Sequence, residues 1–220
     1  MQELKNLEIF GMETLNLFNQ IKLLDHLYFG GGTMLRLCHN LNRYSTDLDF
    51  WIKPKTDPDV IFQKTYNLLL KEFVVKDAAQ KRSTLLFEIQ SNKSKRNLKI
   101  EIRKDQTDFQ WELKIAFSKF TNKQIAVKGL TLEQMMENKV SAFLSREIIR
   151  DCFDIEFLLF KGIPLRVNHP EASRMIKIIK NFKQQDFKVT LGSVLDSEER
   201  AFYTEKQFQF LKEELLKIIK

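Results

Sequence analysis

The chain has 220 residues, of which 43% are hydrophobic and 30% charged, and this composition excludes a mainly disordered protein. Its two cysteines lack metal-ligand or CxxC spacing, and no apolar run approaches the roughly 18 residues of a membrane span. The polar N-terminal residues argue against a signal peptide, so we expect a cytoplasmic protein with no membrane partner, and the net charge of +7 favours a polyanionic partner.

Apolar residues at helical spacing and short alternating runs predict the elements of the first half of the chain. In chain order these are a helix over 13–26, a strand over 27–29, a helix over 34–40, a strand over 47–52, a helix over 60–73, strands over 84–90 and 98–103, and short strands over 111–117 and 124–127. Thr33 is expected to cap the second helix, and the polar segment 91–97 to form a hairpin loop.

From residue 131 onward the pattern is helical. The predicted helices cover 132–145, 150–160, 170–182 and 205–220, with prolines at two of the joins. The chain is therefore predicted to be an α+β protein with two domains, a sheet-containing domain over 1–128 and a helical bundle over 129–220.

A glycine-rich turn followed by two acidic residues carries the strongest functional signal. Gly31, Gly32 and Thr33 stand between a predicted strand and a predicted helix, where backbone amides can bind phosphate. On the next strand Asp47 and Asp49 are two residues apart, so their side chains share one face. Neighbouring carboxylates repel each other unless a cation lies between them. A divalent metal beside an anion-binding turn indicates a nucleotide site.

Glu101 is the candidate for a third carboxylate. It lies on the outward face of the strand over 98–103, and if that strand is adjacent to the first aspartate strand, the three carboxylates can hold two divalent ions. The alternative is an exposed strand residue that pairs with Lys99 or Arg103. Glu88, on the other arm of the hairpin, is the weaker candidate for the same position.

The helical half contains a second charged group. Asp151 and Asp154 are three residues apart and share a helix face, while Lys139 and Arg146 are seven apart and also share one. Lys139 can bind a triphosphate, with Asp154 or Asp151 orienting it or the attacking group. The alternative is an internal salt-bridge network.

Three ordered motifs resemble those of the AbiEii/AbiGii-type toxin family of nucleotidyltransferases, within the superfamily related to DNA polymerase β. The first is GGTMLRL over 31–37, the second is RYSTDLDF over 43–50, and the third is KVSAFLSR over 139–146 followed by RDCFDI over 150–155. The resemblance covers residues 31–155, and the last sixty or so residues match only in being helical.

The resemblance implies a polymerase-β-like domain with a mixed sheet flanked by helices, a C-terminal helical bundle, and a site in the cleft between them. It implies transfer of a nucleoside monophosphate from an NTP, with Mg²⁺ or Mn²⁺ as cofactor. The acceptor would be RNA, such as tRNA, or a protein, and the chain would be the toxin of a toxin–antitoxin pair with a cognate antitoxin. The alternatives are a catalytically inactive NTP-binding or protein-interaction module of this fold, and a basic helical adaptor.

The implied residue roles follow the motifs. Asp47, Asp49 and Glu101 would bind metal and, with Lys139 and Asp154, form the catalytic set. The expected nucleotide-binding residues are Gly31, Gly32, Thr33, Arg36, Ser45 and Lys139. Roles for Arg43, Arg146 and Asp151 are left open, and Arg36 and Arg43 are equally compatible with phosphate contact and with bracing a strand against a helix.

Overall fold

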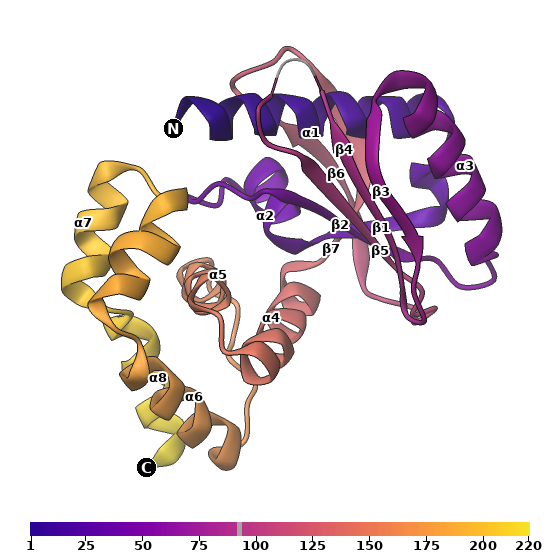
Figure 1. The fold of residues 1–220 in the computed structure, drawn as a ribbon. Coiled ribbons are helices and arrows are strands. Elements are labelled where there is room, and N and C mark those ends of the chain that lie inside the picture. The colour runs from indigo at the N-terminus through magenta and orange to yellow at the C-terminus, as the bar shows by residue number, and fades with distance from the viewer. Residues whose placement is uncertain (92–93) are drawn as a thin grey trace. The chain divides into compact units, whose positions relative to one another are not determined.

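The computed structural model describes residues 1–91 and 94–220, so Asn92 and Lys93 of the predicted hairpin loop lie outside the described residues. The chain divides into two compact units, Met1–Thr131 and Leu132–Lys220, which we call the sheet unit and the helical unit. The boundary predicted after residue 128 falls within the last strand of the sheet, which continues to Leu130. Figure 1 shows the elements of both units.

The elements of the sheet unit follow the predicted order, with one additional strand and several shifted boundaries. They are α1 (Gln2–Gln20), a 3₁₀ turn (Leu24–His26), β1 (Leu27–Gly30), α2 (Gly31–His39), β2 (Asp47–Ile52), α3 (Pro58–Glu72), β3 (Val74–Gln80), β4 (Thr84–Gln90), β5 (Leu98–Arg103), β6 (Trp111–Phe117) and β7 (Gln124–Leu130). The first helix begins eleven residues before the predicted start at 13 and ends at Gln20 rather than at 26. Strand β3 has no counterpart in the prediction, and α2 begins at Gly31 rather than at 34.

The seven strands form one mixed sheet in the order β3-β4-β5-β2-β1-β7-β6. The pairs β2–β5 and β1–β7 are parallel, and the other neighbours are antiparallel. The α+β fold with a mixed sheet is therefore confirmed. Strands β2 and β5 are adjacent and parallel, as Glu101 requires if it is to lie beside the two aspartates of β2.

One face of this sheet is the hydrophobic core of the unit. Phe50 on β2 packs 6.0 Å from Phe18 of α1, and Phe87 on β4 packs 5.1 Å from Phe62 of α3, measured between ring centroids. Ile100 on β5 is fully buried on the same face. Since side chains alternate along a strand, the aspartates of β2 and the charged residues of β5 lie on the opposite face.

The helical unit contains α4 (Leu132–Arg146), α5 (Ile149–Phe160), α6 (His169–Asn181), a π-helical turn (Asp186–Leu191), a 3₁₀ turn (Gly192–Val194), α7 (Ser197–Lys206) and α8 (Gln209–Ile219). Helix α5 is almost entirely buried among the others. The single helix predicted over 205–220 is wrong, because the chain breaks at Gln207 and Phe208, which both have left-handed φ angles. The break turns the fully buried Phe208 ring toward Phe187 and Tyr203.

Glu156 is a buried carboxyl in the middle of α5. Its Oε1 accepts a hydrogen bond of 3.0 Å from the backbone amide of Leu211, in the first turn of α8, and its side chain is hydrogen bonded to Tyr203. Burial raises the pKa of Glu156 above its ordinary value near 4.5, and the two hydrogen bonds only partly oppose that rise.

This raised pKa predicts a pH-dependent stability. Between the ordinary pKa and the raised one, the folded protein binds more protons than the unfolded chain, so the contribution of Glu156 to stability is lost as pH rises through this window. Glu156→Gln removes the ionisation, so its stability relative to the parent should increase with pH, by at most about 1.4 kcal/mol per pH unit. Urea unfolding from pH 4 to pH 7 measures this. Glu205→Gln, at an exposed site where Lys206 lowers the pKa, should not show such an increase.

Candidate active site

The glycine turn places the start of α2 directly against Asp49. Gly30 ends β1 opposite Asp49 in the strand register, and Gly31, with a left-handed φ of +70°, begins the helix. A Cβ atom at Gly31 would overlap the Asp49 carboxylate, so only glycine fits this position. The carboxylate thus lies at a helix N-terminus, where backbone amides without an intrahelical partner and the helix dipole favour negative charge.

Thr33 does not cap this helix as predicted. Gly30 is the N-cap residue and makes no side-chain capping bond, whereas Thr33 lies inside the first turn. Its hydroxyl donates to the backbone carbonyl of Asp47. Thr33 therefore ties the start of α2 to the start of β2, and this bond fixes the first aspartate relative to the glycine turn.

Arg43 and Ser45 line the other side of the turn. A Cβ atom at Gly32 would overlap Nη2 of Arg43 and lie 2.9 Å from Oγ of Ser45. The Arg43 guanidinium is buried and donates to the backbone carbonyl of Tyr44 at 2.9 Å. A positive charge and a hydroxyl thus meet at the helix start.

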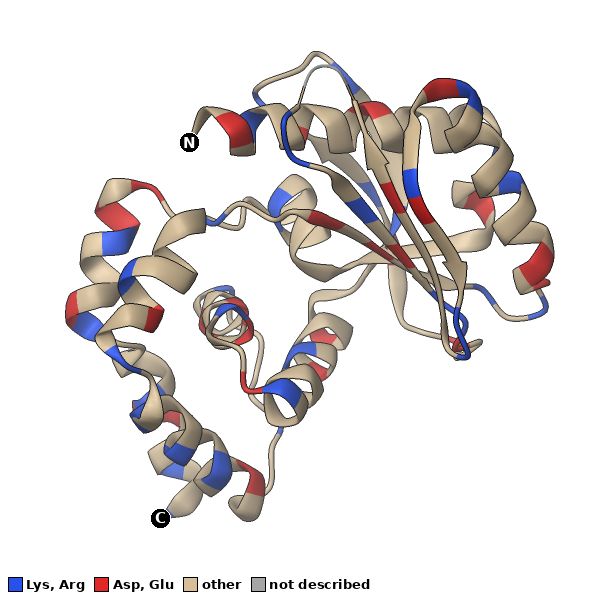
Figure 2. Ribbon diagram, viewed as in Figure 1, with Lys and Arg blue, Asp and Glu red and all other residues tan. Residues whose placement is uncertain are grey.

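The three predicted carboxylates lie on one face of the sheet. In the parallel register of β2 and β5, Asp49 is opposite Glu101 and Asp47 is opposite Lys99. Figure 2 shows acidic residues on these central strands. Glu101 is also ion-paired with Lys99. The two alternatives from the sequence, a position beside the aspartates and a pairing with Lys99, therefore both hold.

Lys99 brings a positive charge into this cluster. Its hydrogen bond to Glu101 is the main cause of its raised pKa, and the negative charges of Asp47 and Asp49 raise the pKa further. The three carboxylates on this sheet face thus stabilise the positively charged form of Lys99. Glu88 is opposite Lys99 on β4 and accepts a 2.6 Å hydrogen bond from the amide of Asn97.

The chemistry of the aspartate pair fits a divalent cation. Mg²⁺ prefers oxygen ligands and is usually bound by one or two carboxylates together with substrate phosphates. Over residues 1–91 and 94–220, no group of three His, Cys, Asp or Glu side chains is arranged to hold a metal ion. The two aspartates would therefore share the ion with phosphate oxygens, and Glu101 would join only after leaving Lys99.

Arg36 braces the unit from inside. Its Nε donates to the buried carboxylate of Glu8 on α1, and its Nη1 donates to the carbonyls of Leu41 and Arg43 at 3.1 and 3.3 Å. Its guanidinium also stacks 3.9 Å from the ring centroid of Tyr44. These contacts fit the alternative in which Arg36 braces a strand against a helix. They do not support a phosphate contact by Arg36, which stays a prediction.

The predicted charged group of the helical unit forms a buried network. Nζ of Lys139 lies 2.7 Å from Asp154 and 3.3 Å from Asp151, and both aspartates are almost completely buried. The half-exposed Arg146 donates two hydrogen bonds to Asp151, at 2.7 and 2.8 Å. The structure thus brings together Lys139, Arg146, Asp151 and Asp154, as their spacing predicts.

The sequence profile of one protein family matches residues 15–217, nearly the whole chain, and that family is described as nucleotidyl transferase AbiEii toxin, Type IV TA system. The chain belongs to the AbiEii family of nucleotidyltransferase toxins. The family resemblance and the nucleotidyltransferase assignment predicted from the sequence are confirmed. A comparison with curated proteins found no match.

Solved structures similar to this AbiEii chain support the fold. JHP933 from Helicobacter pylori is 22% identical, with a TM-score of 0.51 over 93% of this chain and 94% of that one. A second H. pylori structure, provisionally assigned as a nucleotidyltransferase, is also 22% identical, with a TM-score of 0.52 over 94% of this chain and 97% of that one. Within the residues described, no helix is long and apolar enough to cross a membrane.

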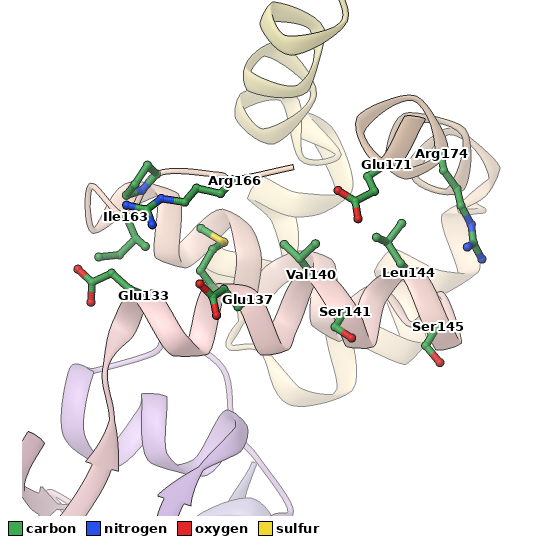
Figure 3. A pocket seen from close by; sticks show the side chains of 12 residues that line it. Glu133, Glu137, Val140, Ser141, Leu144, Ser145, Ile163, Arg166, Glu171 and Arg174 are labelled. Atoms are coloured by element: carbon green, nitrogen blue, oxygen red, sulfur yellow. The ribbon is translucent and has the colours of Figure 1, made fainter. Parts of the chain in front are cut away.

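A pocket of about 460 Å³ lies in the helical unit of the AbiEii chain, apart from the predicted site residues. Glu133, Glu137 and Ser141 of α4 line it, together with Arg166 and with Glu171 of α6 (Figure 3). None of the residues predicted for catalysis or nucleotide binding contributes to its wall.

One important residue of the sheet unit was missed by sequence reasoning. Glu8 on α1 accepts hydrogen bonds from Arg36 and, at 2.6 Å, from Ser118, and is 8% exposed. No sequence signal marks it, because its partners are 28 and 110 residues away.

Proposed function

We propose that this AbiEii protein transfers a nucleoside monophosphate from an NTP to an acceptor hydroxyl in a metal-dependent reaction. The observation that carries the proposal is the position of Asp49. Its carboxylate shares a sheet face with Asp47 and Glu101 and lies against Gly31 at the start of a helix. A metal–triphosphate complex needs carboxylates on one side and phosphate-binding amides on the other.

In the proposed reaction the acceptor hydroxyl attacks the α-phosphorus, a new oxygen–phosphorus bond forms, and the bond to the bridging oxygen breaks to release pyrophosphate. Asp47 and Asp49 would hold Mg²⁺ or Mn²⁺, which when bound neutralises charge on the triphosphate. Gly31 and Gly32 would bind phosphate oxygens through backbone amides, with Arg43 and Ser45 beside them. Glu101 would accept the proton of the acceptor hydroxyl.

Lys139 is proposed to bind the triphosphate as well. An ammonium group has three donors, and the contacts with Asp151 and Asp154 use two of them. The third is left for a phosphate oxygen. Asp154 and Asp151 would thus be positioning residues that hold the Lys139 ammonium in one orientation, with Arg146 securing Asp151.

The biological setting is proposed from the family and the charge. A member of a type IV toxin–antitoxin family is expected to act as a toxin with a cognate antitoxin. The net charge of +7 is compatible with an RNA acceptor such as tRNA, because a basic protein attracts a polyanion. A cytoplasmic location follows from the same proposal, since both NTPs and RNA are found there.

Incubation of the pure protein with each labelled NTP, Mg²⁺ or Mn²⁺, and either total RNA or a protein extract tests the reaction and its acceptor. Asp47→Ala and Asp49→Ala should each reduce label transfer at least about a hundredfold, because the electrostatic contribution of a lost metal ligand is of that order. Asp77→Ala, an exposed aspartate on β3 of the same sheet, is the matched control and should keep full activity. Transfer by Asp49→Ala at the rate of the parent would refute the proposal.

The second candidate function is NTP binding without catalysis. The pairing of Glu101 with Lys99 favours it, because a carboxylate held by an ammonium is less available to an acceptor hydroxyl. Calorimetric binding of an NTP with no pyrophosphate release from any acceptor would support this alternative.

Replacing Lys99 shows how the internal cation affects metal binding. Lys99→Met removes the ammonium that pairs with Glu101 and lies on the same sheet face as Asp47 and Asp49. Mn²⁺ should therefore bind at least about tenfold more tightly, a gain of about 1.4 kcal/mol in binding free energy. Electron paramagnetic resonance of free Mn²⁺ measures the affinity without any turnover. Lys76→Met, an exposed lysine on β3, should leave the affinity unchanged, and an equal gain in both variants would contradict a specific effect.

A further inference from the structure

Strand β6 forms an open, apolar edge of the sheet. In the strand order it has a single neighbour, β7. Its alternate side chains are large, hydrophobic and exposed, and their exposed fractions are 41% for Trp111, 69% for Leu113, 52% for Ile115 and 47% for Phe117. We call these four residues the β6 row. Natural proteins usually protect such edges with charges, prolines or bulges, so an exposed apolar edge strand indicates a partner.

The backbone of β6 is oriented to accept another strand. The carbonyl of Gln110 accepts a 3.0 Å hydrogen bond from Thr131, just beyond the end of β7, so the even-numbered residues direct their backbone groups toward β7. The odd-numbered residues, which form the β6 row, direct theirs away from the sheet. An added strand would bond to the backbone of these residues.

The charges of β6 indicate which strand that is. Between the residues of the β6 row lie Glu112 and Lys114, which form a 2.9 Å ion pair on the other face. If two copies of β6 pair antiparallel about Leu113, Glu112 of each copy is opposite Lys114 of the other, and Leu113 is opposite Leu113. A register centred on Lys114 instead sets two lysines against each other, and one centred on Ile115 forms no charge pair.

We propose that β6 pairs with β6 of a second copy of this chain, antiparallel and centred on Leu113. The two sheets then become one continuous sheet across a two-fold axis. Trp111 of each copy lies opposite Ile115 of the other, so the apolar rows cover each other along the shared edge. Two glutamates and two lysines form an alternating charge network on the opposite face, and the interface is isologous, as most homodimer interfaces are.

Sedimentation equilibrium of the full-length protein across the micromolar range tests the association. The parent should dimerise, and Leu113→Lys should be monomeric with an unchanged circular dichroism spectrum. A parent that is monomeric throughout this range overturns the proposal, and the β6 row would then face a different protein.

Charge reversal tests the register. Glu112→Lys alone and Lys114→Glu alone each place like charges opposite one another, so each should weaken dimerisation at least about tenfold. An equal mixture of these two variants should form heterodimers, because every lysine then lies opposite a glutamate, and the double variant should dimerise like the parent. Glu205→Lys, on an exposed helix position, is the control for net charge. Failure of both the mixture and the double variant to recover overturns the register. None of these measurements depends on nucleotidyl transfer.

Discussion

Gly31→Ala is expected to weaken metal and nucleotide binding strongly while the sheet unit still folds. The added methyl group would occupy the space of the Asp49 carboxylate, so Asp49 must turn away from the helix start or the turn must shift. Either movement separates the carboxylate from the amides that we propose bind phosphate. Mn²⁺ affinity should fall at least about tenfold, and label transfer should be lost, since small misplacements of catalytic groups have large effects on rate.

The cost in stability can be separated from the loss of the site. A left-handed φ at an alanine costs about 1–2 kcal/mol at any position. Gly162, at the end of α5, has a φ of +80° with no atom within 4 Å of an added Cβ, so Gly162→Ala carries that backbone cost alone. Urea unfolding should show a larger loss for Gly31→Ala than for Gly162→Ala, and Mn²⁺ binding should change only in the former. Equal effects of the two variants on Mn²⁺ binding would contradict the proposed contact.

Sequence periodicity predicted the central part of the sheet, and the reason is burial. Strands β2 and β5 lie in the middle of the sheet with one face in the core. Apolar residues therefore alternate throughout β5 and over the first four residues of β2, and both strands were predicted with the observed bounds. Strand β3 is an edge strand whose residues are mainly exposed, and pairing with β4 is what makes it a strand. Its sequence shows no alternation of apolar and polar residues, because neither face of the strand is buried in the core.

At the site, contacts between residues far apart in the sequence likewise limit what the sequence alone can predict. The shared face of Asp47 and Asp49 follows from the two-residue period, and Glu101 could be placed only on condition that β5 is adjacent to β2. The bond from Thr33 to the Asp47 carbonyl, and that from Arg36 to Glu8, depend on tertiary packing. The break between α7 and α8 was missed for the same reason, because it is held by the burial of Phe208 and not by a glycine or proline.

Lys139→Met is expected to be the most destabilising substitution in the helical unit. It leaves Asp154, which is completely buried, without the ammonium 2.7 Å away. Breaking a buried ion pair by removing one partner costs about 3–5 kcal/mol. Arg146→Met should cost about 1 kcal/mol or less, because Arg146 is half-exposed and Asp151 keeps its contact with Lys139. Urea unfolding monitored by circular dichroism compares the two variants.

A double variant then separates the structural role of Lys139 from its proposed role on the triphosphate. Replacing both partners of a buried ion pair with apolar residues is often neutral, so Lys139→Met combined with Asp154→Leu should recover most of the lost stability, while Arg146 still pairs with Asp151. If Lys139 binds the triphosphate, nucleotide affinity and label transfer should stay low in the double variant even though its stability has recovered. Recovery of transfer together with stability would show that the ammonium serves only the internal network. A loss of transfer in a double variant that has recovered its stability cannot be attributed to unfolding.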